Sequence, residues 1–288
     1  MKANETAQHL GILILLVWSW IPVSGCVWRK SAVENDLVMR SIESGDRLMS
    51  QATSIEEVDL AIDVWLQALA DSPSHPRTLG RLSKGYALRG ELVSERRESD
   101  YRVAREYGLK CLAMNPVVAG RIALNNGRLT PDVFEAVPLA DVDCLTWAAY
   151  AWGRALLVRP TSGLGLDLAT IEAMGARAVV LNASFDEGRP MHMYGMALAL
   201  PPAPLNPRYA EAREQLERAC SIAPNRLSIL VDLAELVLGP MNEEDRFTQT
   251  LMYVLEKPLS MGDQLAQQAA KARAQALLEA GPEPRWGR

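Results

Sequence analysis

Histidine and cysteine are scarce in this sequence, with three and four copies in 288 residues. Only His75 and His192 lie beyond the first 25 residues, so the sequence suggests neither a Ser-His-Asp triad nor a metal site. The glycine-containing stretch at 161–165 lacks the lysine of a phosphate-binding loop. We therefore expect a protein that is not an enzyme and that uses no metal or other cofactor.

The few cysteines also argue against a disulfide framework. Beyond Cys26 the sequence holds Cys111, Cys144 and Cys220, an odd and widely spaced set. Cys111 and Cys220 fall on apolar faces of expected helices. We expect them to act as small buried hydrophobic residues rather than as disulfide partners.

A basic segment is missing as well. The net charge is −5 and no block of lysine and arginine occurs, which makes nucleic acid an unsuitable partner. Aromatic residues make up only 6 % of the chain, and alanine and leucine are abundant. This composition favours helices over strands, and segments with the alternation of a strand are nearly absent.

The N-terminus has the features of a secretion signal. Lys2 supplies a positive charge, and 10–20 (LGILILLVWSW) is an apolar run shorter than the roughly 20 residues that cross a bilayer. The following VSGC at 23–26 resembles the bacterial lipobox. The sequence predicts that residues 1–25 are cleaved and that Cys26 carries lipid. The alternatives are an ordinary signal peptide with a chance cysteine, or an uncleaved anchor.

Lipid on Cys26 would hold the chain at a membrane. Each buried methylene contributes about 0.8 kcal/mol, so the two or three acyl chains of a lipoprotein cysteine give a stable anchor. Val27 rather than aspartate follows this cysteine, which favours the outer membrane. We therefore expect the protein on the periplasmic side of a bacterial membrane.

One apolar pattern recurs four times along the chain. The copies begin at Val58, Tyr101, Leu168 and Tyr209, and each has apolar or small residues at i, i+3, i+7, i+10 and i+11, one face of a helix. Many of these positions hold alanine or glycine, which let neighbouring helices approach closely. Proline, which stops a helix, follows three of the copies, at Pro73, Pro116 and Pro224.

The spacing of the copies predicts an all-α fold, an α-α superhelix of tetratricopeptide-like helical hairpins with extra helices. We expect a lipidated linker at 26–35, the repeat domain at 36–280 and a disordered tail at 281–288. Residues 117–139 show little periodicity. The remaining helices are expected at 77–89, 140–158, 227–238, 242–255 and 264–280.

Two stretches are candidates for ligand binding. Trp147, Tyr150 and Arg154 share one helix face, and an arginine beside aromatic rings can bind a carboxylate in an apolar cleft. Core packing, with Arg154 at the rim, is the alternative. The Met-rich segment 190–196 holds His192 and Tyr194, and methionine lines adaptable cavities as well as cores. His192 could bond a ligand or be structural.

Four blocks together resemble the T component of tripartite ATP-independent periplasmic (TRAP) transporters. They are the lipobox, the aromatic helix at 146–156, the Pro-containing turn and helix at 196–225, and the two closing helices at 242–258 and 264–278. One departure is the sequence Leu-Asn-Pro at 205–207, where the family usually has Gly-Gly-Asp. This change leaves the expected fold intact.

The resemblance implies a non-catalytic protein that binds the TRAP solute-binding protein, forms a homotrimer and has a cleft or pore for a small hydrophobic or carboxylate ligand. By this analogy Trp147, Tyr150, Arg154, His192 and Tyr194 would line the cleft. The alternative is a tetratricopeptide-type scaffold lipoprotein that grips peptides or proteins in envelope assembly. A closed aromatic and Met-lined tunnel favours the first function, and an open groove with exposed Asn, Lys and Arg favours the second.

Replacing Cys26 removes the thiol that accepts the lipid, so the Cys26→Ser protein should remain an unprocessed precursor. Gel mobility and incorporation of labelled palmitate measure these two effects. Cys220→Ser is the matched control, because it loses a cysteine but keeps the lipobox. Normal maturation of the Cys26→Ser protein would rule out the lipid anchor.

Overall fold

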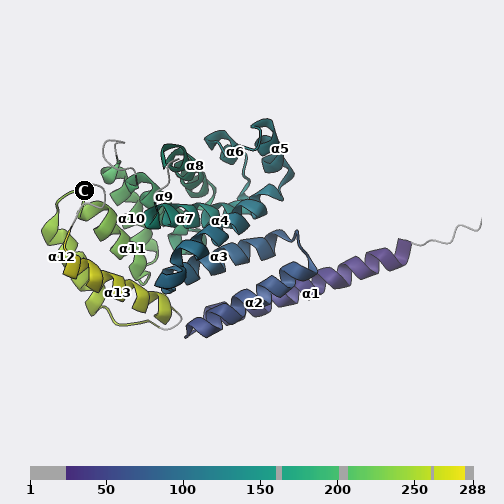
Figure 1. Cartoon of the computed structure of the whole chain (residues 1–288), viewed down its shortest axis with the longest axis horizontal. Helices are drawn as coiled ribbons and strands as arrows, with labels where there is room; N and C mark the ends of the chain where they lie inside the picture. The colour runs from purple at the N-terminus through teal and green to yellow at the C-terminus, as the bar shows by residue number, and fades with distance from the viewer. Residues whose placement is uncertain (1–23, 160–163, 201–206, 261–262, 283–288) are drawn as a thin grey trace, which may run out of the picture. The chain divides into compact units, whose positions relative to one another are not determined.

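The computed structural model describes residues 24–159, 164–200, 207–260 and 263–282, which form helices and no strand (Figure 1). None of the helices in these ranges combines the length and hydropathy that a membrane span requires. The bounds are α1 (Ser24–Gln51), α2 (Ile55–Asp71), α3 (Pro76–Leu92), α4 (Arg97–Ala113), α5 (Pro116–Leu124), α6 (Pro131–Glu135), α7 (Val142–Val158), α8 (Leu164–Asn182), α9 (Phe185–Ala199), α10 (Tyr209–Ile222), α11 (Leu227–Leu233), α12 (Glu244–Glu256) and α13 (Gln264–Ala280).

Three single turns complete the fold: η1 (Ser94–Arg96), η2 (Leu139–Asp141) and the π-helical turn η3 (Ala234–Leu238). The chain divides into two units, 1–37 and 38–288, and α1 runs through both. Most of the predicted signal peptide lies outside the described residues, and the segment expected as a linker at 26–35 is the first part of α1. The expected tail at 281–288 is described only to residue 282.

The all-α prediction is confirmed, and the four repeated segments are helices. Each copy lies in one helix, α2, α4, α8 or α10, and most of its pattern positions are buried. The helices expected at 77–89, 140–158, 242–255 and 264–280 are α3, α7, α12 and α13. The one expected at 227–238 is divided between α11 and η3.

Caps and prolines set the helix boundaries. Ser54 accepts a hydrogen bond from the Glu57 amide, and Glu57 in turn accepts one from the Thr53 amide, which satisfies backbone groups at the start of α2. Asn115 caps α5, because its Oδ1 accepts hydrogen bonds from the amides of Val117 and Val118. Pro116 follows the end of α4 and is the first residue of α5. At this position the missing N–H is not destabilising, because the first amides of a helix have no partner within the helix.

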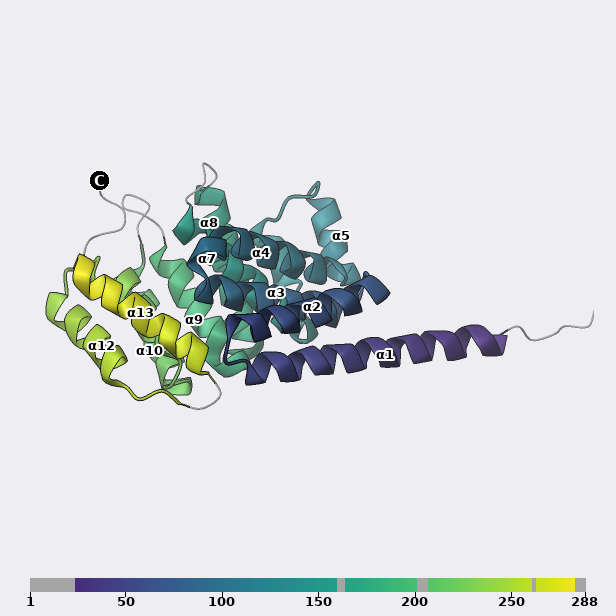
Figure 2. The same ribbon diagram turned by 60° about the horizontal axis from the view of Figure 1, so that its bottom comes forward.

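Glycine brings several helix pairs into close contact. α3 packs on α4 and α4 packs on α7, while α13 packs on α12 (Figures 1 and 2). A Cβ at Gly108 of α4 would lie 2.6 Å from the Ala148 Cβ of α7 and 2.8 Å from its Cα. At Gly195 of α9 it would lie 2.7 Å from Leu216 Cγ of α10. The interpretation of small residues as contacts between helices is therefore correct at Gly108.

Two expectations need correction. The stretch 117–139, which lacks helical periodicity, contains α5 and α6, and they bury Val118, Val133 and Phe134. They are too short for a period to show in sequence. The cysteines were also expected to be unpaired, but Cys111 of α4 and Cys144 of α7 form a disulfide with a Cα–Cα distance of 5.7 Å. The packing of α4 on α7 brings these residues together.

Substituting Gly108 tests the contact between α4 and α7. A methyl group there meets the backbone of the facing helix, so Gly108→Ala should lower the free energy of unfolding by about 1–3 kcal/mol. Urea unfolding at neutral pH measures this change. Gly120→Ala is the matched control, since no atom lies within 4 Å of the added Cβ and alanine should stabilise α5 by about 0.5–1 kcal/mol. Equal effects of the two substitutions would contradict the close contact.

Candidate functional site: a buried ion cluster and two cavities

The carboxylate of Asp232, on α11, is the centre of a buried ion cluster. Arg154 of α7 binds it through two hydrogen bonds, Nη1 to Oδ1 at 2.9 Å and Nη2 to Oδ2 at 2.6 Å. Arg273 of α13 approaches Oδ1 at 2.7 Å, and His192 of α9 lies 2.6 Å from Oδ2. Burial alone would raise the pKa of Asp232, but Arg154 and Arg273 outweigh it and hold the pKa well below its ordinary value.

His192 is neutral in this cluster. Its side chain is fully buried, and burial lowers the pKa to about 4 despite the hydrogen bond with Asp232. The neutral ring therefore donates from Nε2 to Asp232, and Nδ1 has no partner among the described residues. In the unfolded chain the ring protonates near its ordinary pKa of 6.5, whereas in the folded protein it stays neutral down to about pH 4. The free energy of unfolding is therefore highest above pH 6.5 as far as His192 is concerned, and it declines as the pH falls toward 4.

The structure brings four of the five candidate binding residues together. The Tyr150 ring lies edge-on to both Trp147 and His192, with 5.7 Å between centroids in each pair, and the Tyr150 hydroxyl accepts a hydrogen bond from Arg154 Nε at 3.0 Å. Tyr194 lies elsewhere, against Gly175 of α8, and is partly exposed. Arg154 is not at a rim, because its side chain is only 6 % exposed.

The partners of these residues were not identified in the sequence. Asp232 carries the clearest overlooked signal, since it is a lone acid in the apolar run LSILVDL of α11. Glu91 accepts a hydrogen bond from Tyr150, and Arg273 also pairs with Glu235. Arg189 lies over the rings of Trp147 and Tyr150, 4.8 Å from each centroid. None of these five residues belongs to a recognisable sequence motif.

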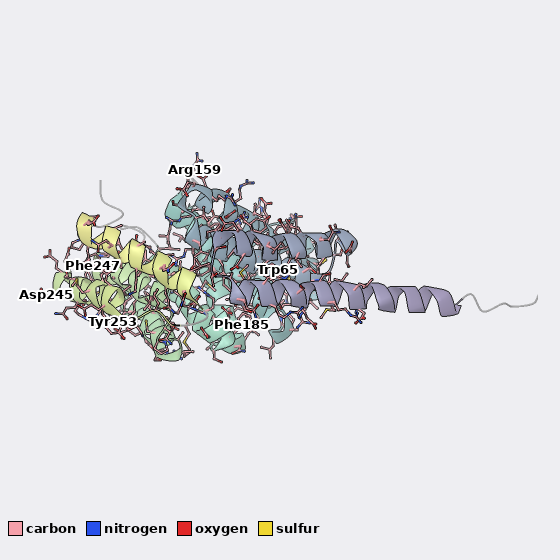
Figure 3. All side chains as sticks on the ribbon, turned by 90° about the horizontal axis from the view of Figure 1, so that it is seen from below. Trp65, Arg159, Phe185, Asp245, Phe247 and Tyr253 are labelled. Carbon is pink, nitrogen blue, oxygen red and sulfur yellow. A yellow bond between two sulfur atoms is a disulfide. The ribbon has the colours of Figure 1, made fainter. Side chains whose placement is uncertain are left out.

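One cavity is lined by residues of the cluster, and a second, larger cavity is lined by Glu91 and Arg189. The smaller, of about 380 Å³, is lined by Tyr101, Arg154 and Arg273 among others. The larger, of about 910 Å³, is lined on its apolar side by Trp65 and Phe185, which Figure 3 labels. Glu91, Ser228 and Ala266 line both cavities, so these three residues form a shared wall.

A left-handed turn places charged groups at the larger cavity. Asp186, Glu187 and Gly188 have φ values of 43°, 54° and 76° inside α9, a conformation that costs free energy for the two non-glycine residues. Lys84 binds Asp186 Oδ1 at 2.8 Å, and Arg226 donates to the Asp186 carbonyl at 2.6 Å. Burial would raise the pKa of Asp186, but Lys84 and the neighbouring arginines lower it far below its ordinary value.

A family model described as the TRAP transporter T-component matches residues 89–283. The chain belongs to this family. The match extends from the end of α3 through α13, about two thirds of the chain, and includes the ion cluster and the shared cavity wall. No curated protein sequence matches the chain. In the described part of this T component, no group of His, Cys, Asp and Glu residues is arranged to hold a metal ion.

Arg154 has a structural function that its substitution would reveal. Arg154→Ala leaves Asp232 with one fewer buried counter-charge, so it should lower the free energy of unfolding by about 3–5 kcal/mol. The double variant Arg154→Met, Asp232→Leu should lose less than the sum of the two single changes, which urea unfolding measures. If Arg154→Ala left stability unchanged and weakened only ligand binding, Arg154 would instead be the carboxylate clamp that its sequence position suggests.

Proposed function

We propose that this protein is a lipid-anchored periplasmic accessory protein of a TRAP transporter. It binds the TRAP solute-binding protein and holds a small hydrophobic or carboxylate ligand between its helices, and it thereby assists solute uptake without catalysis. The family match from the end of α3 through α13 is the observation that carries this proposal.

The larger cavity supports the ligand-binding part of the proposal. Its volume of about 910 Å³ is in the range of small-molecule sites, roughly 300–1,000 Å³. Trp65, Leu88 and Phe185 give it an apolar side, while Arg81 and Arg189 lie among its charged lining. A cavity of this size, with one apolar side and charged side chains on the rest of its lining, can hold a small organic molecule that has a polar group.

The proposed anchor is the lipid on Cys26, in the first turn of α1. It would keep the helical unit 38–288 at the periplasmic side of a membrane, with the outer membrane favoured by Val27. Within the same proposal the protein forms a homotrimer, as its family implies. The membrane contact then comes from acyl chains and not from the folded unit.

Binding to a purified TRAP solute-binding protein tests this function. We expect saturable binding of the full-length chain in mild detergent to the solute-binding protein of a TRAP system from the same cell. We also expect slower uptake of that system's solute when the gene is deleted. A solute-binding protein of an ATP-driven transporter is the negative control. Unchanged uptake together with no saturable binding would refute the proposed function.

A further inference from the structure

Tyr101 of α4 has a hydroxyl group without a partner at the smaller cavity. Its side chain is only 3 % exposed and lines that cavity, with the ring packed so closely on α3 that a Cβ at Gly90 would lie 2.9 Å from Tyr101 Cε1. The hydroxyl makes no hydrogen bond within the described ranges, but it keeps accessible surface, unlike the enclosed indole nitrogens of Trp147 and Trp152. The accessible part of this otherwise buried side chain is therefore an unused donor at the cavity.

Arg97 brings a second unused donor to the same cavity. It precedes Tyr101 by four residues on α4, so the two side chains are neighbours on one helix face, and both line the cavity. Arg97 Nε donates to the Gly90 carbonyl at 3.2 Å, which fixes one edge of the half-buried guanidinium. Its two terminal nitrogens keep accessible surface and form neither a hydrogen bond nor an ion pair with any described residue.

The acidic side chains of this cavity leave these two donors free. Glu91 accepts a hydrogen bond from Tyr150, and Glu98 forms an ion pair with Arg159 at 3.0 Å. Glu95, the third acid in the lining, is exposed to solvent. The cavity therefore has donors to offer, while two of its three carboxylates are already bound within the fold.

The Tyr101 hydroxyl is protonated and lies in surroundings that favour a negative charge. Burial raises its pKa above the ordinary value of 10, so the neutral phenol can donate a hydrogen bond at neutral pH. Arg154, Arg97 and Arg273 oppose this rise in the pKa, whereas Glu91 adds to it. Arg154 and Arg273 are held in the ion cluster, so Arg97 is the cation that remains for a ligand.

The rest of the lining includes an apolar surface of modest size. It consists of Leu157 and Val158 at the end of α7 and of Ala266, Ala269 and Ala270 on α13. The volume of about 380 Å³ is near the lower end of the range for small-molecule sites, roughly 300–1,000 Å³. A short hydrocarbon chain can therefore be accommodated beside the two donors.

We propose that the smaller cavity binds a monocarboxylate with a short apolar chain, and that Tyr101 and Arg97 hold its carboxylate. One carboxylate oxygen accepts a hydrogen bond from the Tyr101 hydroxyl, and the other accepts one from a terminal nitrogen of Arg97. A carboxylate is favoured over a neutral acceptor, because hydrogen bonds to an ion are about twice as strong as those between neutral groups. The inference rests on the proposed function only in that the protein binds a small ligand.

Three probes separate the donors from the apolar wall. Hexanoate has a carboxylate and a chain, acetate has little more than the carboxylate, and hexylamine has the chain with a cation. In calorimetric titrations of the full-length protein, we expect hexanoate to bind at least about 10-fold more tightly than acetate, because its methylene groups are buried. Hexylamine should not bind, because its ammonium group accepts no hydrogen bond. Equal affinity for hexanoate and hexylamine, or no binding of hexanoate, would overturn the inference.

A single-atom change tests the hydroxyl contact. Tyr101→Phe keeps the ring and should weaken hexanoate binding at least about 10-fold, while the melting temperature stays unchanged because the hydroxyl has no partner in the protein. Tyr107→Phe is the matched control on the same helix, since Tyr107 stacks on Tyr86 at 5.8 Å and lines neither cavity. Unchanged hexanoate affinity of the Tyr101→Phe protein would overturn the inference.

Matched arginine variants test the ionic contact. Arg97→Gln should weaken hexanoate binding at least about 10-fold, whereas Arg96→Gln should leave it unchanged. Arg96 is the neighbouring residue, but it pairs with Asp59 and lines neither cavity. If Arg97→Gln lowers the melting temperature, Arg97→Lys keeps the charge and should retain the preference for hexanoate over hexylamine. Unchanged hexanoate affinity in a folded Arg97→Gln protein would contradict the proposed contact.

The results also separate this inference from the proposed function. Normal binding of the solute-binding protein without hexanoate binding would refute the ligand contacts alone. Hexanoate binding that depends on Tyr101 and Arg97, without binding of the solute-binding protein, would refute the partnership alone.

Discussion

The carboxylate of Asp232 holds four helices together. It is fully buried and is contacted by Arg154 of α7, His192 of α9 and Arg273 of α13, while Asp232 itself lies on α11. A buried carboxylate is tolerated only with such partners. The four helices must therefore be packed so that all three side chains reach the Asp232 carboxylate. Arg154 and Arg273 of this cluster also line the smaller cavity, so the position of that wall depends on the same constraint.

The left-handed turn at 186–188 is the second constraint on the site. Its backbone is unfavourable for Asp186 and Glu187, but Lys84 and Arg226 bind the side chain and carbonyl that the turn presents. Arg189 follows the turn directly; its Nε lies 3.5 Å from Asp186 Oδ2, and its guanidinium lies over the rings of Trp147 and Tyr150. Local strain is thus offset by ion pairs that position the cavity's charged side.

Much of the fold could be predicted from sequence, because α2, α4, α7 and α13 are long enough for their apolar period to be visible. The helix α9 was not predicted, because its left-handed residues and Pro190 interrupt the apolar period. The shared face of Trp147, Tyr150 and Arg154 follows from helical spacing alone. Their partners do not, because Asp232 is 78 residues from Arg154 and only the packing of α11 on the other helices makes them neighbours.

Arg154 and Arg189 show why residue type alone does not identify a ligand contact. Both are buried arginines beside the same tyrosine, but the forked edge of Arg154 is occupied by Asp232, whereas Arg189 has an Nη1 without a hydrogen bond among the described residues. A ligand carboxylate at Arg154 would have to displace a bidentate carboxylate whose own charge would then be left buried. Arg189 is likewise close to carboxylates of the protein itself, with Glu91 at 3.6 Å from Nη1 and Asp186 at 3.5 Å from Nε, so the burial of either arginine is explained by ion pairing within the fold.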